Sequence, residues 1–497
     1  MDTISPARKT AYTILMAMER GQSHSDDLLR GKAVTALSPA DRNLTTTLVL
    51  GVLRWQIRLD QQLRPLLKRP NAKLDAEILI VLRLGAFQLL HLDRIPAPAA
   101  IDESVELAKQ AGHRFASGMV NAVLRKLAAA RAERVSTLSK SAGFADLAIT
   151  PPDEQEAPGH DLIRAENAAK AREASVPEGS SAAELILAHA HPAWMVERWN
   201  RFYGLAAARS ICIHGQSQPA LTLRLQDPTA EAEFIQTGIQ LEPGELLTAA
   251  RALLSGDVAA TDAFREGRVR IQDEGSQLVG EIAANACGNL DRKVKNILDT
   301  CAAPGGKTLI LAERHPQARI VACESSPLRL EQLRLRLAPH AERIECRQAD
   351  AAALTEEAVY DLALTDVPCS GTGTLGRNPE IRHRLRLEDL PRQAERQRAI
   401  LRAALRAVHP GGRVVYSTCS LEPEENEHVI AAVLADGPNA RALSLESSID
   451  SLLAGGILTP GGAQHLRRSL TPEGALRLLP GVFGTDGFFI ALIERIG

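Results

Sequence analysis

The sequence is poor in several features that mark particular protein classes. Aromatic residues make up only 3% of its 497 residues, so any grip on nucleic acid would rely on arginine rather than on broad stacking platforms. The seven cysteines contain no CxxC pair, which disfavours a disulfide framework and a zinc knuckle. No stretch approaches about 18 uninterrupted apolar residues, and the first residues have no apolar signal core. We therefore expect a cytoplasmic protein with free thiols, no membrane span and no metal.

The remaining composition is that of a globular chain. Apolar residues make up 45% and charged residues 24% of the sequence, and its length favours two or three domains. The net charge of −2 neither supports nor excludes a nucleic-acid partner, because the local distribution of charge decides. We expect the protein to be a monomer.

Residues 1–130 are predicted to form an all-helical domain. Apolar residues recur there with the i, i+3, i+4, i+7 spacing of helices that bury one face. Three such stripes are Ala11, Ile14, Leu15 and Met18; Ile78, Val81, Leu82, Gly85, Ala86 and Leu89; and Val120, Val123, Leu124 and Leu127. Ser38-Pro39 and Pro96-Ala97-Pro98 resemble helix starts or turns. A bundle of six or seven helices is the simplest architecture.

The middle of the chain is predicted to contain a linker and a small subdomain. Residues 131–182 are rich in Pro, Glu, Ser and Ala without sustained apolar periodicity, which is typical of a flexible polar linker. Residues 183–285 are predicted to form a small α+β lead-in subdomain. Its signals are a strand-like alternation at residues 221–226 and a strand, turn and helix at residues 269–284.

Residues 286–497 alternate strand and helix patterns, which predicts a doubly wound α/β sheet. The expected strands are residues 296–299, 318–324, 343–350, 360–368, 412–420 and 486–495. In sheets of this kind, ligands bind at the carboxyl ends of the strands. The loops that follow these strands are therefore the expected place of the functional site.

The segment DTCAAPGGKT, residues 299–308, follows the first of these strands and opens a helix. A phosphate-binding P-loop would need glycine where Cys301 stands, and a GxGxxG dinucleotide motif is absent, so a tight structural turn is the remaining alternative. However, Glu324, Asp350 and Asp366 end the following strands, and an acid at the end of the second strand is placed to bind ribose hydroxyls. The combination predicts a site for a nucleoside cofactor.

Two cysteines follow adjacent strands at the same edge. Cys369 lies in DVPCSGTGTLGRNPEIRHR, after the fourth strand, and Cys419 lies in YSTCSLEPEENE, after the fifth. A single buried cysteine is usually inert packing. Two of them beside small polar residues at adjacent strand ends indicate reactive thiols.

Taken together, CAAPGGK, DVPCSG, STCSLEPEENE and the terminal DGFF resemble the RNA cytosine-5 methyltransferases of the NOL1/NOP2/Sun superfamily over residues 190–497. The resemblance implies a Rossmann-like domain that uses S-adenosylmethionine to methylate C5 of a cytosine. It implies that Cys419 is the nucleophile and that Cys369 serves proton removal or release of the covalent adduct. The cofactor contacts would be Cys301, Ala302, Ala303, Pro304, Gly305, Gly306, Lys307, Glu324, Asp350 and Asp366. Glu324 stands where the family mostly has Asp, which lengthens the reach by one methylene.

The implied chemistry has a clear physical reason. C5 of cytosine is too weak a nucleophile to attack a methyl sulfonium unaided, whereas a thiolate of Cys419 added to C6 turns the ring into an enamine-like nucleophile. Cationic or dipolar surroundings are needed to form that thiolate near neutral pH. Asp366 is expected to hydrogen-bond the amino and N3 edge of the base.

The helical front also resembles an RNA-binding domain. Residues 7–29 and 48–63 are similar to a NusB-like domain, and such a domain ahead of this core resembles the bacterial Sun/Fmu (RsmB-type) enzymes. The resemblance implies a cytosine in small-subunit ribosomal RNA as the substrate. We expect no further RNA-binding domain after the DGFF motif. Two alternatives stay open, an enzyme that acts on transfer RNA and a catalytically silent RNA-binding assembly factor.

The chain from residue 377 to residue 413 is strongly basic. Its ten arginines are 377, 382, 384, 386, 392, 396, 398, 402, 406 and 413, against four acids. Arg377, Arg382 and Arg384 follow Cys369 on the same loop and are predicted to contact RNA phosphates or bases, while the distal half is equally well explained as a solvated helix face. Arg224 resembles a family RNA-contact position, although Gln226 stands where Asn is usual. The target base must be unpaired or extruded, because C6 is inaccessible inside a stacked helix.

Overall fold

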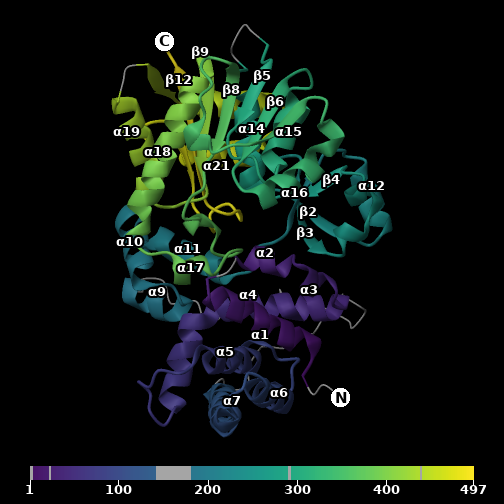
Figure 1. Cartoon of the computed structure of the whole chain (residues 1–497), viewed down its shortest axis with the longest axis vertical. Helices are drawn as coiled ribbons and strands as arrows, with labels where there is room; N and C mark the ends of the chain where they lie inside the picture. The colour runs from purple at the N-terminus through teal and green to yellow at the C-terminus, as the bar shows by residue number, and fades with distance from the viewer. Residues whose placement is uncertain (1–3, 22–23, 142–180, 289–292, 437–438) are drawn as a thin grey trace. The chain divides into compact units, whose positions relative to one another are not determined.

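The protein is described from a computed structural model of the whole chain (Figure 1). The described residues are 4–21, 24–141, 181–288, 293–436 and 439–497. They divide into two compact units. Unit 1 comprises Met1–Gln218 together with Gly376–His383, and unit 2 comprises Pro219–Leu375 and Arg384–Gly497.

Unit 1 is helical, as its periodic stripes predict. Its longer helices are α1 (Pro6–Glu19), α4 (Pro39–Leu63), α5 (Ala76–His91), α6 (Ala97–Gln110), α7 (Ser117–Ser141), α9 (Ala182–His189), α10 (Ala193–Tyr203) and α11 (Leu205–Gln216), with the short α2 (Ser25–Leu29) and α3 (Lys32–Thr35). The side chains of all three predicted stripes are buried in one core. Ser38 caps α4 by accepting a hydrogen bond from Asp41 N, and α6 begins within Pro96-Ala97-Pro98, so both predicted helix starts are confirmed.

The structure corrects two predicted boundaries. The linker predicted for residues 131–182 does not begin at residue 131, because α7 continues to Ser141 through alanine, arginine and glutamate, which are good helix formers. Residues 142–180 of that prediction lie outside the described residues. The lead-in subdomain predicted for residues 183–285 is also divided. Helices α9 to α11 belong to unit 1, where α9 and α11 contact α4, and only the later part belongs to unit 2.

Unit 2 begins with a small antiparallel sheet. Its strands are β1 (Thr222–Leu225), β2 (Gln240–Pro243), β3 (Ala250–Ser255) and β4 (Val269–Ile271), in the order β2-β3-β1-β4. Helices α12 (Ala230–Gln236) and α13 (Asp262–Arg265) connect its strands, and α14 (Glu274–Asn285) leads into the next sheet. The predicted strands at β1 and β4 are confirmed, whereas β2 and β3 were not predicted.

The large sheet of unit 2 is the predicted doubly wound sheet. Its strands are β5 (Asn296–Asp299), β6 (Arg319–Glu324), β7 (Ile344–Gln348), β8 (Tyr360–Asp366), β9 (Val408–Thr418), β10 (Ala440–Leu443) and β12 (Phe488–Arg495), with β11 (Leu476–Leu478) paired to β12. The order is β10-β12-β9-β8-β5-β6-β7, and its central part from β12 to β6 can be followed in Figure 1. Strands β5 to β9 run parallel, and β12 pairs antiparallel with β9 and β10. A Rossmann-like sheet is therefore confirmed.

Helices cover both faces of this sheet. One face packs against α14, α15 (Gly306–Arg314), α16 (Pro327–Leu337), α20 (Glu446–Ala454) and α21 (Pro460–Arg468), and the other packs against α18 (Asp389–Ala407) and α19 (Glu427–Ala435). Neighbouring strand residues alternate between the two cores: Val415 enters the first, while Val414 and Tyr416 enter the second. Because both faces are buried, the carboxyl ends of β5, β6, β8 and β9 meet along one edge, where their loops are free to form a site.

Candidate active site

The loop after β5 is built for a ligand to approach its backbone. Ala302 N donates to Cys323 O at 2.8 Å, which ties the loop to the end of β6, and Gly305 N donates to Ala302 O at 2.7 Å. Gly305 has a φ of +99°, a conformation that favours glycine, and α15 starts immediately after it at Gly306. A sharp turn that opens a helix exposes amide groups at the helix start, where polar ligands bind.

Asp299, the last residue of β5, is a buried acid. Its Oδ2 accepts a hydrogen bond from Thr308 Oγ1 at 2.7 Å, which fixes the loop against α15. Its Oδ1 is buried and has no protein partner among the described residues. Burial raises the pKa of Asp299 to about 7. A buried oxygen without a partner beside a glycine turn fits a site that a polar ligand completes.

The acids predicted to end the next strands lie where the prediction put them. Glu324 is the last residue of β6 and is 5% exposed, and one of its oxygens accepts from Ser326 N at 2.7 Å. Asp350 follows β7, is exposed, and accepts from Ala352 N at 3.1 Å. One acid is therefore held rigidly and the other faces solvent, and both lie at the carboxyl edge of the sheet. This donor set suits ribose hydroxyls and a purine ring.

Lys307 and Asp366 link the cofactor loop to the end of β8. Lys307 Nζ lies 2.8 Å from Asp366 Oδ2, and Ser417 Oγ donates to Asp366 Oδ1 at 2.7 Å. Burial acts to lower the pKa of Lys307, but the carboxylate of Asp366 and the charge that Cys419 carries as a thiolate outweigh burial, so this pKa is raised. Lys307 is thus a fixed cation beside Cys419. Its ammonium group also lies 5.7 Å from the ring centre of Phe488, in the DGFF motif.

The two predicted thiols meet. Cys369 Sγ and Cys419 Sγ lie 3.2 Å apart, and both cysteines are free and half-buried. The pKa of Cys369 is raised well above the ordinary thiol value, first by its hydrogen bond with Cys419, then by burial and by the nearby charges of Cys419 and Glu425. Cys369 therefore holds its proton tightly.

Backbone contacts lock three loops around the thiols. Gly373 N donates to Cys419 O at 2.9 Å, and Gly487 N, from DGFF, donates to Gly373 O at 2.8 Å. A Cβ atom at Gly373 would lie 2.6 Å from Gly487 O and 2.8 Å from Cys419 O, so only glycine permits this approach. The DGFF motif therefore belongs to the site as a support for the cysteine loops.

Two buried residues of the site were missed by the sequence analysis. Glu425 binds both cysteine loops through Ser370 and Ser420, and Gln397 on α18 donates to Glu425 Oε1 and to Pro368 O, both at 2.9 Å. Glu425 was visible only as one acid of the ENE segment, and Gln397 as one polar residue of an arginine-rich helix. Neither has a clear local signal, because the contacts of Gln397 and the contact of Glu425 with Ser370 span about 28 to 55 residues in sequence.

Two of the predicted RNA contacts are placed against expectation. Arg224 is 3% exposed, and its Nη2 donates to Glu281 Oε1 at 2.7 Å and to Glu313 Oε2 at 2.9 Å. Arg382 is 2% exposed within unit 1. It donates to Arg54 O, Ala190 O, Gly215 O and Gln216 Oε1. The prediction needed exposed guanidinium groups, and both are instead buried and bound to protein oxygens, so their structural role replaces the expected contact with RNA.

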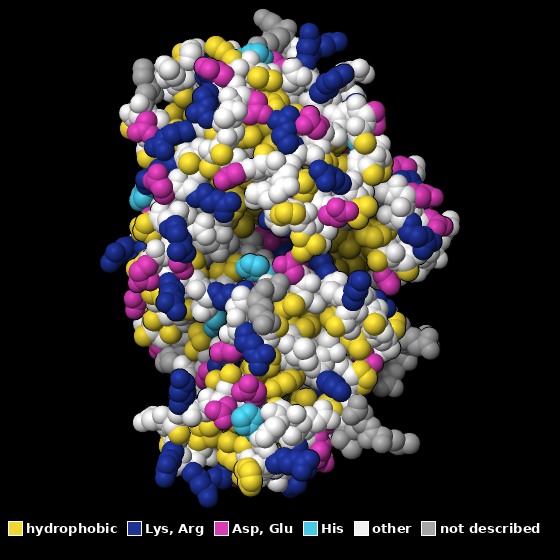
Figure 2. All heavy atoms as spheres, viewed as in Figure 1, with side chains coloured by type: hydrophobic (Ala, Val, Ile, Leu, Met, Phe, Trp, Pro, Cys, Tyr) yellow, Lys and Arg dark blue, Asp and Glu magenta, His cyan; other side chains and the backbone are white. Residues whose placement is uncertain are grey.

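The other predicted arginines are more accessible. Arg377 and Arg384 are half-buried. On α18, arginines form ion pairs, such as the exposed Arg392 with Asp389 at 2.8 Å and the half-buried Arg398 with Glu395 at 3.4 Å. Figure 2 shows basic and acidic side chains interspersed over the viewed face of the molecule. These pairs favour the solvated-face reading of the distal arginines, and Arg377 and Arg384 stay predicted RNA contacts.

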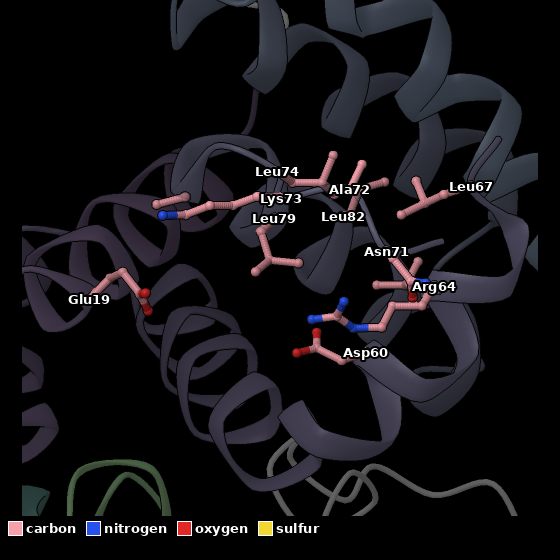
Figure 3. Close-up of a pocket in the computed structure, with 12 residues that line it drawn as sticks. Glu19, Asp60, Arg64, Leu67, Asn71, Ala72, Lys73, Leu74, Leu79 and Leu82 are labelled. Carbon is pink, nitrogen blue, oxygen red and sulfur yellow. The ribbon is translucent and has the colours of Figure 1, made fainter. Parts of the chain in front are cut away.

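A cavity of about 410 Å³ lies in unit 1, between the end of α4 and the start of α5 (Figure 3). Charged side chains of Glu19, Asp60, Arg64 and Lys73 stand around leucines that include Leu79. None of the predicted site residues lines it. Within the described part of the chain, no cluster of three His, Cys, Asp or Glu side chains suits a metal ion, and no helix is both long and apolar enough to cross a bilayer.

Comparison with solved structures confirms the fold. The crystal structure of PH0851 matches 99% of this chain and 99% of its own, with a TM-score of 0.71 at 21% identity. NSun6 from Pyrococcus horikoshii, solved with SFG, matches 62% of this chain and 99% of its own, with a TM-score of 0.51 at 18% identity. At these identities the likeness to both structures concerns the fold alone.

Sequence comparison gives the family. Residues 290–494 match the 16S rRNA methyltransferase RsmB/F family, and residues 5–129 match the NusB family. The probable ribosomal RNA small subunit methyltransferase B of Bacillus subtilis is 32% identical over 99% of both chains. The ribosomal RNA small subunit methyltransferase B of Pseudomonas putida is 31% identical over 98% of both chains. The chain therefore belongs to the 16S rRNA methyltransferase RsmB/F family, and the predicted NusB-like front is confirmed.

Proposed function

We propose that the protein methylates C5 of a cytosine in 16S ribosomal RNA, through a transient bond between Cys419 Sγ and C6 of the base. The observation that carries this proposal is the pair of thiols 3.2 Å apart at the ends of β8 and β9, next to the Lys307–Asp366 pair. The names of the full-length relatives support ribosomal RNA as the substrate class. An rRNA substrate would place the reaction in the cytoplasm, and the monomeric state stays a prediction.

The residues of the cofactor loop have separate tasks. S-adenosylmethionine, when bound, supplies the methyl group as an electrophile. Residues 301–307 would hold it through the turn after β5, Glu324 would accept hydrogen bonds from its ribose, and Asp350 would lie near its adenine. Lys307 orients Asp366 through the 2.8 Å contact between Nζ and Oδ2, so Asp366 is placed to accept a hydrogen bond from the amino group of the target base.

The thiols carry the covalent part of the reaction. The Cys419 thiolate, beside the Lys307 cation, donates an electron pair to C6, and the ring gains nucleophilic character at C5. Once C5 has received the methyl group, its proton is lost to a base, and the C6–S bond breaks with its electron pair returning to sulfur. Cys369, at 3.2 Å from Cys419, is the group placed to serve this release.

The substrate test uses purified protein, labelled S-adenosylmethionine and separate samples of 16S ribosomal RNA, 23S ribosomal RNA and transfer RNA. We expect label only in 16S ribosomal RNA, and bisulfite mapping of RNA from a deletion strain should show one protected cytosine lost. Label in transfer RNA alone would identify a sister activity instead. Absence of label in every RNA, with cofactor binding intact, would favour a silent assembly factor.

A further inference from the structure

Glu425 lies at the centre of a closed hydrogen-bond network. It ends a short 3₁₀ turn, Pro423–Glu425, and its side chain is fully buried. Oε1 accepts from Ser370 N and from Gln397 Nε2, both at 2.9 Å. Oε2 accepts from the hydroxyls of Ser370 and Ser420, which also lie 3.0 Å from each other. Both carboxylate oxygens are therefore saturated by donors, so the carboxylate has a fixed orientation.

The two serines of this network are the residues that follow the two site cysteines. Ser370 directly follows Cys369, and Ser420 directly follows Cys419. One carboxylate therefore holds the residue next to each thiol, on two loops that come from different strands. The two loops are therefore coupled through a single side chain.

We propose that Glu425 is a positioning residue that joins the two cysteine loops through Ser370 and Ser420 and so sets the geometry and protonation of the thiol pair. This inference rests on the proposed function, because it assumes that Cys369 and Cys419 take part in the methyl transfer. Glu425 does not contact the substrate in this role. It acts through the two serines.

The charges around Cys369 explain how Glu425 would influence the protonation of this thiol. Its sulfur lies 3.2 Å from Cys419 Sγ and near the charge of Glu425, while the Gly371 amide is a compensating donor. The anionic charge of Glu425 opposes ionisation of Cys369. In the resting site Cys369 therefore keeps its proton.

Two substitutions separate position from charge. Glu425→Asp keeps the charge but shortens the reach by one methylene, so one carboxylate no longer spans both serines. Glu425→Gln keeps the length and removes the charge. Glu424→Gln, at the neighbouring half-buried position, is the matched control. If either Glu425 variant is unstable, Ser420→Ala removes one of the donors and tests the same link with a smaller change.

The first readout is single-turnover methylation of 16S ribosomal RNA with saturating cofactor. Because misplacing a reacting group by about 1 Å costs about 100-fold in rate, we expect Glu425→Asp to lower kcat about 100-fold and Glu425→Gln at least about 10-fold, with the Kd for S-adenosylmethionine within about twofold of wild type. Ser420→Ala should lie between wild type and Glu425→Asp. Rates of both Glu425 variants equal to that of Glu424→Gln would overturn the proposal.

The second readout does not depend on activity. In a Cys419→Ala background, the pH dependence of iodoacetamide labelling at Cys369, followed by peptide mass spectrometry, reports the pKa of this thiol. Glu425→Gln should shift the labelling curve to lower pH, and Glu425→Asp should leave it nearly in place. An unchanged labelling curve in Glu425→Gln would refute the proposed effect of the Glu425 charge on the pKa of Cys369. If wild type methylates no RNA while the curve shifts as expected, the proposed function fails and the role of Glu425 in the thiol pair stands.

Discussion

The two units differ in the polar side chains that they bury. In unit 1, His189 and His191 are fully buried, and their ring nitrogens have no partner among the described residues. In unit 2, Arg224 and Glu281 are buried as a salt bridge with an N–O distance of 2.7 Å. Both units bury paired charges, since Arg83 and Asp60 of unit 1 lie 2.7 Å apart, but the buried histidines of the described residues all belong to unit 1. The difference teaches that the two units should respond to pH and to substitution in different ways, although they belong to one chain.

The largest expected difference is the response to acid. Burial lowers the pKa of His189 and of His383 to about 4, so the folded unit 1 does not take up the protons that the unfolded chain binds below pH about 6.5. Stability is fully present above that pH and is lost as the pH falls toward 4, by a total on the order of 5 kcal/mol. All three tryptophans of the chain lie in unit 1, so their fluorescence reports its unfolding.

We expect the tryptophan transition to occur before β8 and β9 lose protection from hydrogen exchange. The control is His191→Phe, whose ring keeps the edge contact with Trp199, at a centroid distance of 5.8 Å in the native pair, and has no proton to gain. This variant should unfold at lower pH than wild type. Loss of the sheet before unit 1 would show that the comparison is wrong.

A smaller loss is expected when the buried cation of unit 1 is removed. Arg382→Met leaves three backbone carbonyls and one side-chain oxygen without their donor, so the free energy of unfolding of unit 1 should fall by about 3 kcal/mol or more. Urea denaturation followed by tryptophan fluorescence measures this. Arg386→Met, at an exposed position of the same basic segment, should change stability by no more than about 0.5 kcal/mol. Equal effects of the two variants would mean that burial of Arg382 contributes nothing.

Unit 2 should show the opposite pH dependence at Asp299. Because burial raises its pKa to about 7, the folded unit holds a proton that the unfolded chain releases above pH about 4, so this contribution is full below pH 4 and is lost as the pH rises through 7. Asp299→Asn keeps an acceptor for Thr308 and removes the charge. At pH 8 it should stabilise unit 2 by about 2 kcal/mol, with little effect at pH 5. A variant destabilised equally at both pH values would contradict this account.

The smallest expected effect concerns the anchor of residues 376–383 in unit 1. Ser25 donates its backbone N–H and its hydroxyl to Glu380 Oε1, at 3.2 and 2.8 Å. Ser25→Ala removes only the hydroxyl bond, so we expect a loss of about 1 kcal/mol in thermal or urea unfolding of unit 1. Ser117→Ala, which removes an exposed hydroxyl that bonds Arg114 O, serves as the comparison and should cost less.

The sequence predicted those parts of the fold that have a local signal. Strands β5 to β9 follow from short apolar runs, and their ends fall within a few residues of prediction because acids or small polar residues mark them. The meeting of Cys369 and Cys419 follows from topology, since adjacent parallel strands end at one edge. The antiparallel strands β2, β3, β10 and β11 were missed, because their short half-exposed sequences have no distinctive period.

The remaining differences depend on pairing between distant residues. Arg224 and Arg382 look in the sequence like any exposed arginine, and only the folded chain shows that carboxylates or carbonyls enclose them. The sequence around Glu425 also gives no sign of its role, because its partner Ser370 lies 55 residues away. Buried polar networks of this kind depend on tertiary position, which neither periodicity nor a local motif encodes.

The covalent bond between Cys419 and the RNA is the central claim, and trapping it is the most direct test. Cys369→Ala protein, incubated with S-adenosylmethionine and 16S ribosomal RNA, should accumulate a protein–RNA adduct that survives denaturation. Mass spectrometry of the digested adduct should then find the nucleotide on the peptide that contains Cys419. An adduct on any other residue, or an adduct that still forms in Cys419→Ala, would contradict the mechanism.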